Sequence, residues 1–71
     1  MDKATAREVS TLMLDFGAKL DESVRLVKDH SSEAEFVKYR DAVGQILGCM
    51  LLDIMNPLYE EHPDLKPPQL K

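Results

Sequence analysis

The residues AVGQILGCMLLDIMNPL, which run from Ala42 to Leu58, decide the fold of this chain. Only Gln45, Asp53 and Asn56 among them are clearly polar. Placed on a helix, the apolar side of this stretch spans an arc of roughly 200°, about twice the width that one neighbouring helix covers. We therefore expect one face to pack within the chain and a second face to be covered by another molecule, most simply a second copy.

The length of the chain supports this expectation. The 71 residues have room for one domain, and a single core of this size seldom supplies more than about 3–5 kcal/mol of stability without a disulfide, a metal or a partner subunit. The only cysteine, Cys49, cannot form a disulfide within the chain. Of these three stabilising features, the sequence supports only a partner subunit, so we expect a homodimer.

Acidic residues outnumber basic residues by 13 to 9, which gives a formal charge of −4. This charge opposes binding to nucleic acid and to anionic membranes, and it favours a cationic partner or simply solubility. The first residues, MDKATARE, lack the apolar core and cleavage region of a secretory signal. The longest apolar run is shorter than the roughly 20 residues that span a bilayer. We therefore expect a cytoplasmic protein without membrane association.

The first helix is predicted to span about residues 5–29. Thr5 and Glu8 match a capping box, in which each side chain accepts a hydrogen bond from the backbone of the other residue, so we expect the helix to begin at Thr5. Seven apolar residues then recur at three- and four-residue spacing, which is typical of an amphipathic helix with one buried face. They are Ala6, Val9, Met13, Phe16, Leu20, Val24 and Val27.

The second helix is predicted to span about residues 33–56. It is expected to begin there because Ser32 and Glu35 repeat the capping-box pattern. The short link between the two helices allows only an antiparallel hairpin. One apolar face of the second helix is expected to contact the first helix. It comprises Phe36, Tyr39, Val43, Ile46, Leu47, Met50, Ile54 and Leu58.

Asn56 and Pro57 are expected to end or kink the second helix, because proline lacks an amide proton and disfavours helical geometry in the residue before it. A short turn over 57–62 follows, and Asn56 could cap it as a fresh helical turn through Glu61. The proline-punctuated residues 63–71 predict an extended tail. The expected hairpin domain therefore covers residues 1–62.

A second apolar face of the helix over 33–56 is the predicted dimer interface. Gly44 and Gly48 lie one turn apart on it, although each glycine costs about 0.5–1 kcal/mol relative to alanine within a helix. Small residues at this spacing allow another helix to approach closely; the alternative is that both glycines are only tolerated. The predicted interface residues are Val37, Gly44, Gly48, Leu51 and Met55.

Four acidic residues spaced seven apart form the best-ordered polar feature of the first helix. They are Glu8, Asp15, Glu22 and Asp29. This acidic ridge could bind a basic protein partner. The alternative is the ordinary solvated face of an outer helix.

The residues with chemistry suited to catalysis or metal binding are His30, Cys49 and His62. Their spacing matches no metal-binding motif, and the chain has neither a glycine-rich phosphate loop nor a serine motif of the hydrolase type. We therefore predict no enzyme activity, no catalytic residue, no cofactor and no metal site.

The expected fold is all-α: an antiparallel helical hairpin that pairs into a homodimeric four-helix bundle, with the second helix at its centre. The expected function is that of a small, non-catalytic dimerisation or protein-interaction module with a regulatory role. The alternative is a nucleic-acid-associated regulator that uses the basic flank of the first helix, although no aromatic residue stands there to stack on bases. That flank comprises Lys3, Arg7, Arg25 and Lys28.

Overall fold

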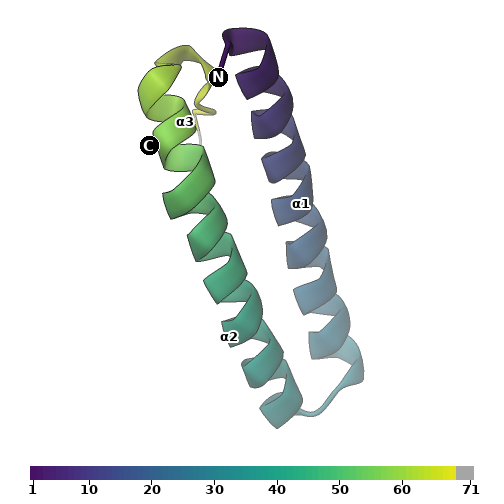
Figure 1. Ribbon diagram of the computed structural model, residues 1–71. Coiled ribbons are helices and arrows are strands. Elements are labelled where there is room, and N and C mark those ends of the chain that lie inside the picture. The colour runs from purple at the N-terminus through teal and green to yellow at the C-terminus, as the bar shows by residue number, and fades with distance from the viewer. Residues whose placement is uncertain (69–71) are drawn as a thin grey trace.

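The computed structural model describes residues 1–68, and residues 69–71 of the predicted tail lie outside the described part. Two long helical runs lie side by side and antiparallel (Figure 1). Every element in residues 1–68 is helical, so the predicted all-α class is confirmed. The elements are α1 (Lys3–His30), α2 (Glu33–Cys49), the π-helical segment η1 (Met50–Met55), α3 (Asn56–Glu61) and the 3₁₀ turn η2 (Pro63–Leu65). We call α1 and the continuous run Glu33–Glu61 the helix pair.

Helix α1 begins two residues before the predicted start. The backbone N–H of Thr5 donates to the carboxylate of Asp2 at 2.7 Å, so Asp2 is the N-cap and Thr5 lies within the first turn. The prediction of a Thr5 capping box is therefore wrong. Asp is at least as good an N-cap as Thr, because its carboxylate is a charged acceptor that also favours the positive end of the helix dipole.

The turn between the helices follows the sequence pattern. Helix α2 begins at Glu33, and the Ser32 hydroxyl oxygen accepts a hydrogen bond from the backbone N–H of Glu35 at 3.2 Å. This confirms Ser32 as the predicted N-cap. The Glu35 carboxylate accepts from the Ser32 hydroxyl at 3.0 Å, which fixes the first turn of α2.

Pro57 interrupts the regular α-helix without ending the helical run, so the predicted end at residue 56 is wrong. The alternative of a further helical turn through Glu61 matches α3. The run passes through η1 and continues as α3 to Glu61, with Pro57 in the first turn of α3. In a regular α-helix the ring of Pro57 would meet the carbonyl of Asp53, four residues earlier. The wider turn of η1 relieves this conflict: the N–H of Asn56 donates to the carbonyl of Leu51, five residues back.

Segment η1 changes which side chains face α1. A π turn takes up about one residue more than an α turn, so Met55 comes into line with Leu47, and Ile54 comes into line with Ile46. Met55 is accordingly buried, with 7% of its surface exposed, whereas Ile54 is 41% exposed. The prediction that Ile54 packs against the first helix is therefore wrong in the single chain. Met55 was predicted on the dimer face, and in the single chain it is already buried.

The best-packed part of the molecule is the end where α1 begins and α3 ends, which we call the closed end. Ala6, Met55, Leu58 and Tyr59 form its buried cluster. The buried hydroxyls of Ser10 and Tyr59 are 2.5 Å apart and share a hydrogen bond across the two helices. Val43, in α2, is the other buried hydrophobic residue in the described part of the chain.

The segment after α3 turns back onto the start of α1. Pro63–Leu65 forms a 3₁₀ turn, so this part of the predicted extended tail is helical instead. Lys3 forms an ion pair with Asp64, and Leu65 packs against the buried cluster of the closed end. The region beyond Pro57 therefore completes the closed end.

Candidate interaction surface

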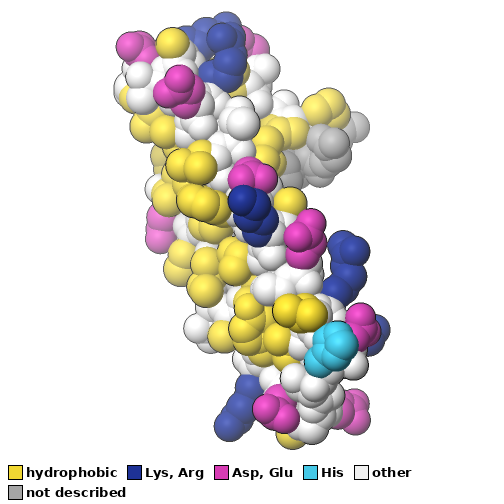
Figure 2. All heavy atoms as spheres, turned by 90° about the vertical axis from the view of Figure 1, so that its right-hand side faces the viewer, with side chains coloured by type: hydrophobic (Ala, Val, Ile, Leu, Met, Phe, Trp, Pro, Cys, Tyr) yellow, Lys and Arg dark blue, Asp and Glu magenta, His cyan; other side chains and the backbone are white. Residues whose placement is uncertain are grey.

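Large apolar side chains reach the surface along most of the helix pair. Figure 2 shows hydrophobic side chains down one edge of the molecule over much of its length. Single exposed apolar residues are normal in soluble proteins, whereas a continuous group usually marks a contact surface. Within residues 1–68 the exposed large hydrophobic residues are Met1, Leu12, Leu14, Phe16, Leu26, Ile46, Leu51, Leu52 and Ile54.

One apolar groove runs between the helices on the side of Phe16 and Ile46. Its volume is about 360 Å³. Phe16 is 45% exposed and Ile46 is 49% exposed, although the sequence pattern predicted both within the contact between the helices. The groove residues are Phe16, Lys19, Leu20, Ser23, Tyr39, Ile46 and Met50. Together with Ile54, which η1 brings into line with Ile46, they are called the Phe16 face.

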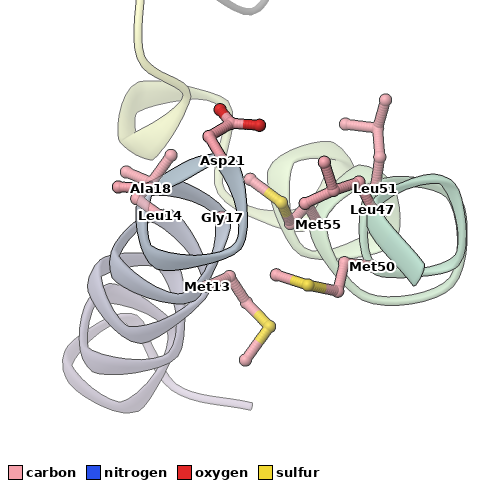
Figure 3. Close-up of a pocket in the computed structure, with 9 residues that line it drawn as sticks. All are labelled: Met13, Leu14, Gly17, Ala18, Asp21, Leu47, Met50, Leu51 and Met55. Carbon is pink, nitrogen blue, oxygen red and sulfur yellow. The ribbon is translucent and has the colours of Figure 1, made fainter. Parts of the chain in front are cut away.

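A second groove, of about 400 Å³, is lined largely by methionine and other apolar residues. In Figure 3 the side chains of Met50 and Met55 extend from the second helical run toward α1, and the Asp21 carboxylate lies at the edge. The helices come close here, since a Cβ atom added to Gly17 would lie 3.8 Å from Leu47. This methionine groove is lined by Met13, Leu14, Gly17, Ala18, Asp21, Leu47, Met50, Leu51 and Met55.

The five predicted interface residues do not form one open surface. Met55 is buried at the closed end, and Val37 is half-buried. Leu51 is 37% exposed, at the edge of the methionine groove. A Cβ atom added to Gly44 or Gly48 would meet nothing within 4 Å, so neither glycine is required by a close contact within the described chain.

The acidic ridge is solvent-exposed along its whole length, since Glu8, Asp15, Glu22 and Asp29 are all exposed. Asp15 lies 3.5 Å from Lys19, four residues later on the same helix. The basic flank is exposed as well, but Lys3 is engaged by Asp64. An exposed pair of this kind contributes at most about 1 kcal/mol and leaves both residues accessible.

The residues suited to chemistry are spread over the molecule. His30 ends α1 at the turn, Cys49 is exposed at the end of α2, and His62 lies at the closed end. The Nε2 atom of His62 lies 3.0 Å from both the carbonyl of Met1 and the carboxylate of Glu61. Within residues 1–68, no group of three or more His, Cys, Asp and Glu residues is arranged to hold a metal ion.

The run Glu33–Glu61 meets the length and composition criteria for a membrane-crossing helix. It has 29 residues, the mean hydropathy of its most apolar window is 1.2, and 22% of that window is buried. The sequence pattern predicted no membrane span, because its longest uninterrupted apolar run is shorter than the roughly 20 residues that cross a bilayer. These criteria are also met by core helices of soluble proteins, and the low burial shows how much of this helix is left uncovered.

Comparison of the chain with protein-family models, with curated proteins and with solved structures gave no match.

Proposed function

We propose that this chain is a non-catalytic interaction module that associates with a second copy of itself to form a four-helix bundle. One observation carries the proposal: Phe16, Ile46 and Ile54 keep 41–49% of their surface exposed, in a described chain with five buried hydrophobic residues. Two helices cannot bury both sides of their contact, whereas four helices enclose a common core.

The energetic case rests on the same residues. Full burial of a Leu, Ile or Phe side chain contributes about 1.5–3 kcal/mol, so covering the exposed half of each of these residues contributes about 1 kcal/mol. Three such side chains in each subunit contribute an amount similar to the net stability of about 3–5 kcal/mol that a small core supplies. Self-association would therefore raise the stability of the helix pair substantially.

A second protein chain suits this surface better than a lipid bilayer does. Helix α1 packs along the apolar run and exposes Glu8, Asp15 and Glu22 to its surroundings, and ionised side chains within the hydrocarbon region are costly. In a four-helix bundle these acidic residues stay in water. The dimer then displays two acidic ridges, and a basic protein is the partner whose charge would complement them.

The test is the solution mass of the protein as a function of concentration. We expect sedimentation equilibrium to give twice the chain mass of 8.0 kDa, and we expect the midpoint of thermal unfolding to rise with protein concentration. A folded particle of single-chain mass at all concentrations would contradict the proposal. Sedimentation of the protein with added lipid vesicles, at the expense of the dimer, would contradict it as well.

A further inference from the structure

We infer that the second copy covers the Phe16 face, and not the side of the helix pair that carries Gly44, Gly48 and the methionine groove. This inference rests on the proposed self-association and adds the identity of the contact surface. Both helices contribute to the Phe16 face: Phe16 of α1 and Ile46 of α2 line its groove. Ile54 lines a separate hollow, and the register through η1 places it in line with Ile46. Packing of this face on its own copy buries the same residues in both subunits, as a two-fold axis requires.

One whole side of the molecule has about the size that a stable dimer contact needs. The helix pair is 44 Å long and 16 to 19 Å across, so one side covers roughly 700 to 840 Å² in projection (44 × 16 and 44 × 19 Å). A specific interface of standard size buries about 800 Å² on each partner. One whole side of the molecule is therefore needed for the contact, and the two sides can be compared as alternatives.

The polar groups of the Phe16 face already have partners within their own chain. The Tyr39 hydroxyl donates to the Ser23 oxygen at 2.7 Å, and the Ser23 hydroxyl donates to the carbonyl of Leu20 at 2.6 Å. Lys19, the charged residue of the groove, lies 3.5 Å from Asp15 at its edge. An apolar surface, such as the same face of a second copy, can therefore cover the Tyr39 and Ser23 hydroxyls without leaving them unsatisfied. The Lys19 side chain is 70% exposed and long enough to keep its ammonium group in water at the edge of the contact.

On the opposite side, which carries the methionine groove, one charged group has no ion-pair partner in the described part of the chain. Asp21 lines the methionine groove, and the ion pairs found within residues 1–68 do not include it. A second copy seated on this groove would remove water from the exposed Asp21 carboxylate at its edge (Figure 3), and this desolvation is unfavourable without a charged partner. Gly44 and Gly48 leave open space on their helix and contribute no apolar side chain to a contact.

The test compares two substitutions of an exposed apolar residue by glutamate on the same helical run. Ile46→Glu places a charge on the Phe16 face, whereas the matched control Leu52→Glu changes a residue that is 65% exposed and lies outside both grooves. We expect Ile46→Glu to raise the dimer dissociation constant at least about thirtyfold, the loss typical of a central interface residue. We expect Leu52→Glu and Gly48→Leu to change it less than about threefold.

A second measurement on the unmodified protein does not depend on the folding of any variant. On dilution through the dissociation range, the methyl NMR signals of Ile46 and Ile54 should shift, and those of Leu14 should stay in place. A dimer that is unaffected by Ile46→Glu but weakened by Gly48→Leu, or methyl shifts confined to Leu14, would overturn the assigned face and leave self-association intact. A wild-type protein that is monomeric at every concentration would instead overturn self-association, and the assigned face with it.

Discussion

The closed end and the Phe16 face differ in how the chain covers its own apolar residues. At the closed end, residues from both helical runs and from η2 meet, and Met55, Leu58 and Tyr59 are buried. Along the Phe16 face the same two helices lie side by side with no third segment of residues 1–68 over them, and Phe16 and Ile46 stay about half exposed. Apart from Val43, the buried hydrophobic residues of the described chain therefore lie where a third segment closes over the contact between the two helices.

The difference extends to the hydroxyl pairs that link the helices. The bond between Ser10 and Tyr59 is buried, whereas the bond between Ser23 and Tyr39 is only partly buried. The stability of the single chain should therefore depend mainly on the closed end. The Phe16 face should affect association more than folding.

Tyr59→Ala tests this division with the largest expected effect. Removing a buried aromatic side chain leaves a cavity and typically costs about 3–5 kcal/mol, which equals most of the stability expected for a core of this size. We expect this variant to be largely unfolded at room temperature, as measured by far-UV circular dichroism with urea titration. Tyr39→Ala, at the partly buried position, should remain folded, and equal losses for the two variants would contradict the comparison.

The two hydroxyl pairs provide the next test. Ser10→Ala leaves the buried Tyr59 hydroxyl without its partner, and such a loss costs about 1–3 kcal/mol. Tyr39→Phe should cost less than about 1 kcal/mol, because Ser23 keeps its bond to Leu20 and the site is reached by water. Urea unfolding of both variants measures the difference. In the double variant Ser10→Ala/Tyr59→Phe the loss should be smaller than the sum of the two single losses.

Hydrophobic spacing and capping patterns predicted the all-α class and the Ser32 N-cap. They do not predict the exchange between Ile54 and Met55, because a regular α-helix advances about 100° per residue and η1 does not. The proline itself was the available signal, since an uninterrupted helix through Pro57 needs a wider turn before it. The N-cap at Asp2 could also have been found, because Asp lies three residues before Thr5 and ranks above it as a cap.

The candidate surface was harder to predict than the fold. Ser10 continues the three- and four-residue spacing of Ala6, Met13 and Gly17, but its polar side chain concealed its place in the core. Phe16 and Ile46 are on the apolar faces of their helices, as predicted. Helical spacing alone does not show that they lie at the edge of the contact, because this depends on how the two helices are rotated against each other.

The open side of the helix pair can be tested with alanine at its glycines. Gly44→Ala and Gly48→Ala add a methyl group where nothing lies within 4 Å, so each should stabilise the fold by about 0.5–1 kcal/mol through higher helix propensity. Thermal unfolding at fixed protein concentration measures this gain, and sedimentation checks that the dimer is unchanged. A lower unfolding temperature or a smaller dimer fraction would show that another helix approaches these positions closely.

The smallest expected effect concerns pH and the closed end. The ion pair with Lys3 lowers the pKa of Asp64 below its ordinary value of 3.8, and the hydrogen bond from Thr5 lowers the pKa of Asp2. A lowered folded-state pKa stabilises the protein above the unfolded-state value, and this contribution is lost as pH falls through the folded-state value. The unfolding midpoint should therefore be constant just above pH 5 and fall below about pH 4.

The Asp64→Asn variant tests this expectation, because its unfolding midpoint should fall less steeply with decreasing pH than that of the wild type. The unfolding midpoint of Glu22→Gln, on the acidic ridge, should follow the wild type. Identical pH profiles for Asp64→Asn and the wild type would show that the contact between η2 and α1 does not contribute to the closed end in solution.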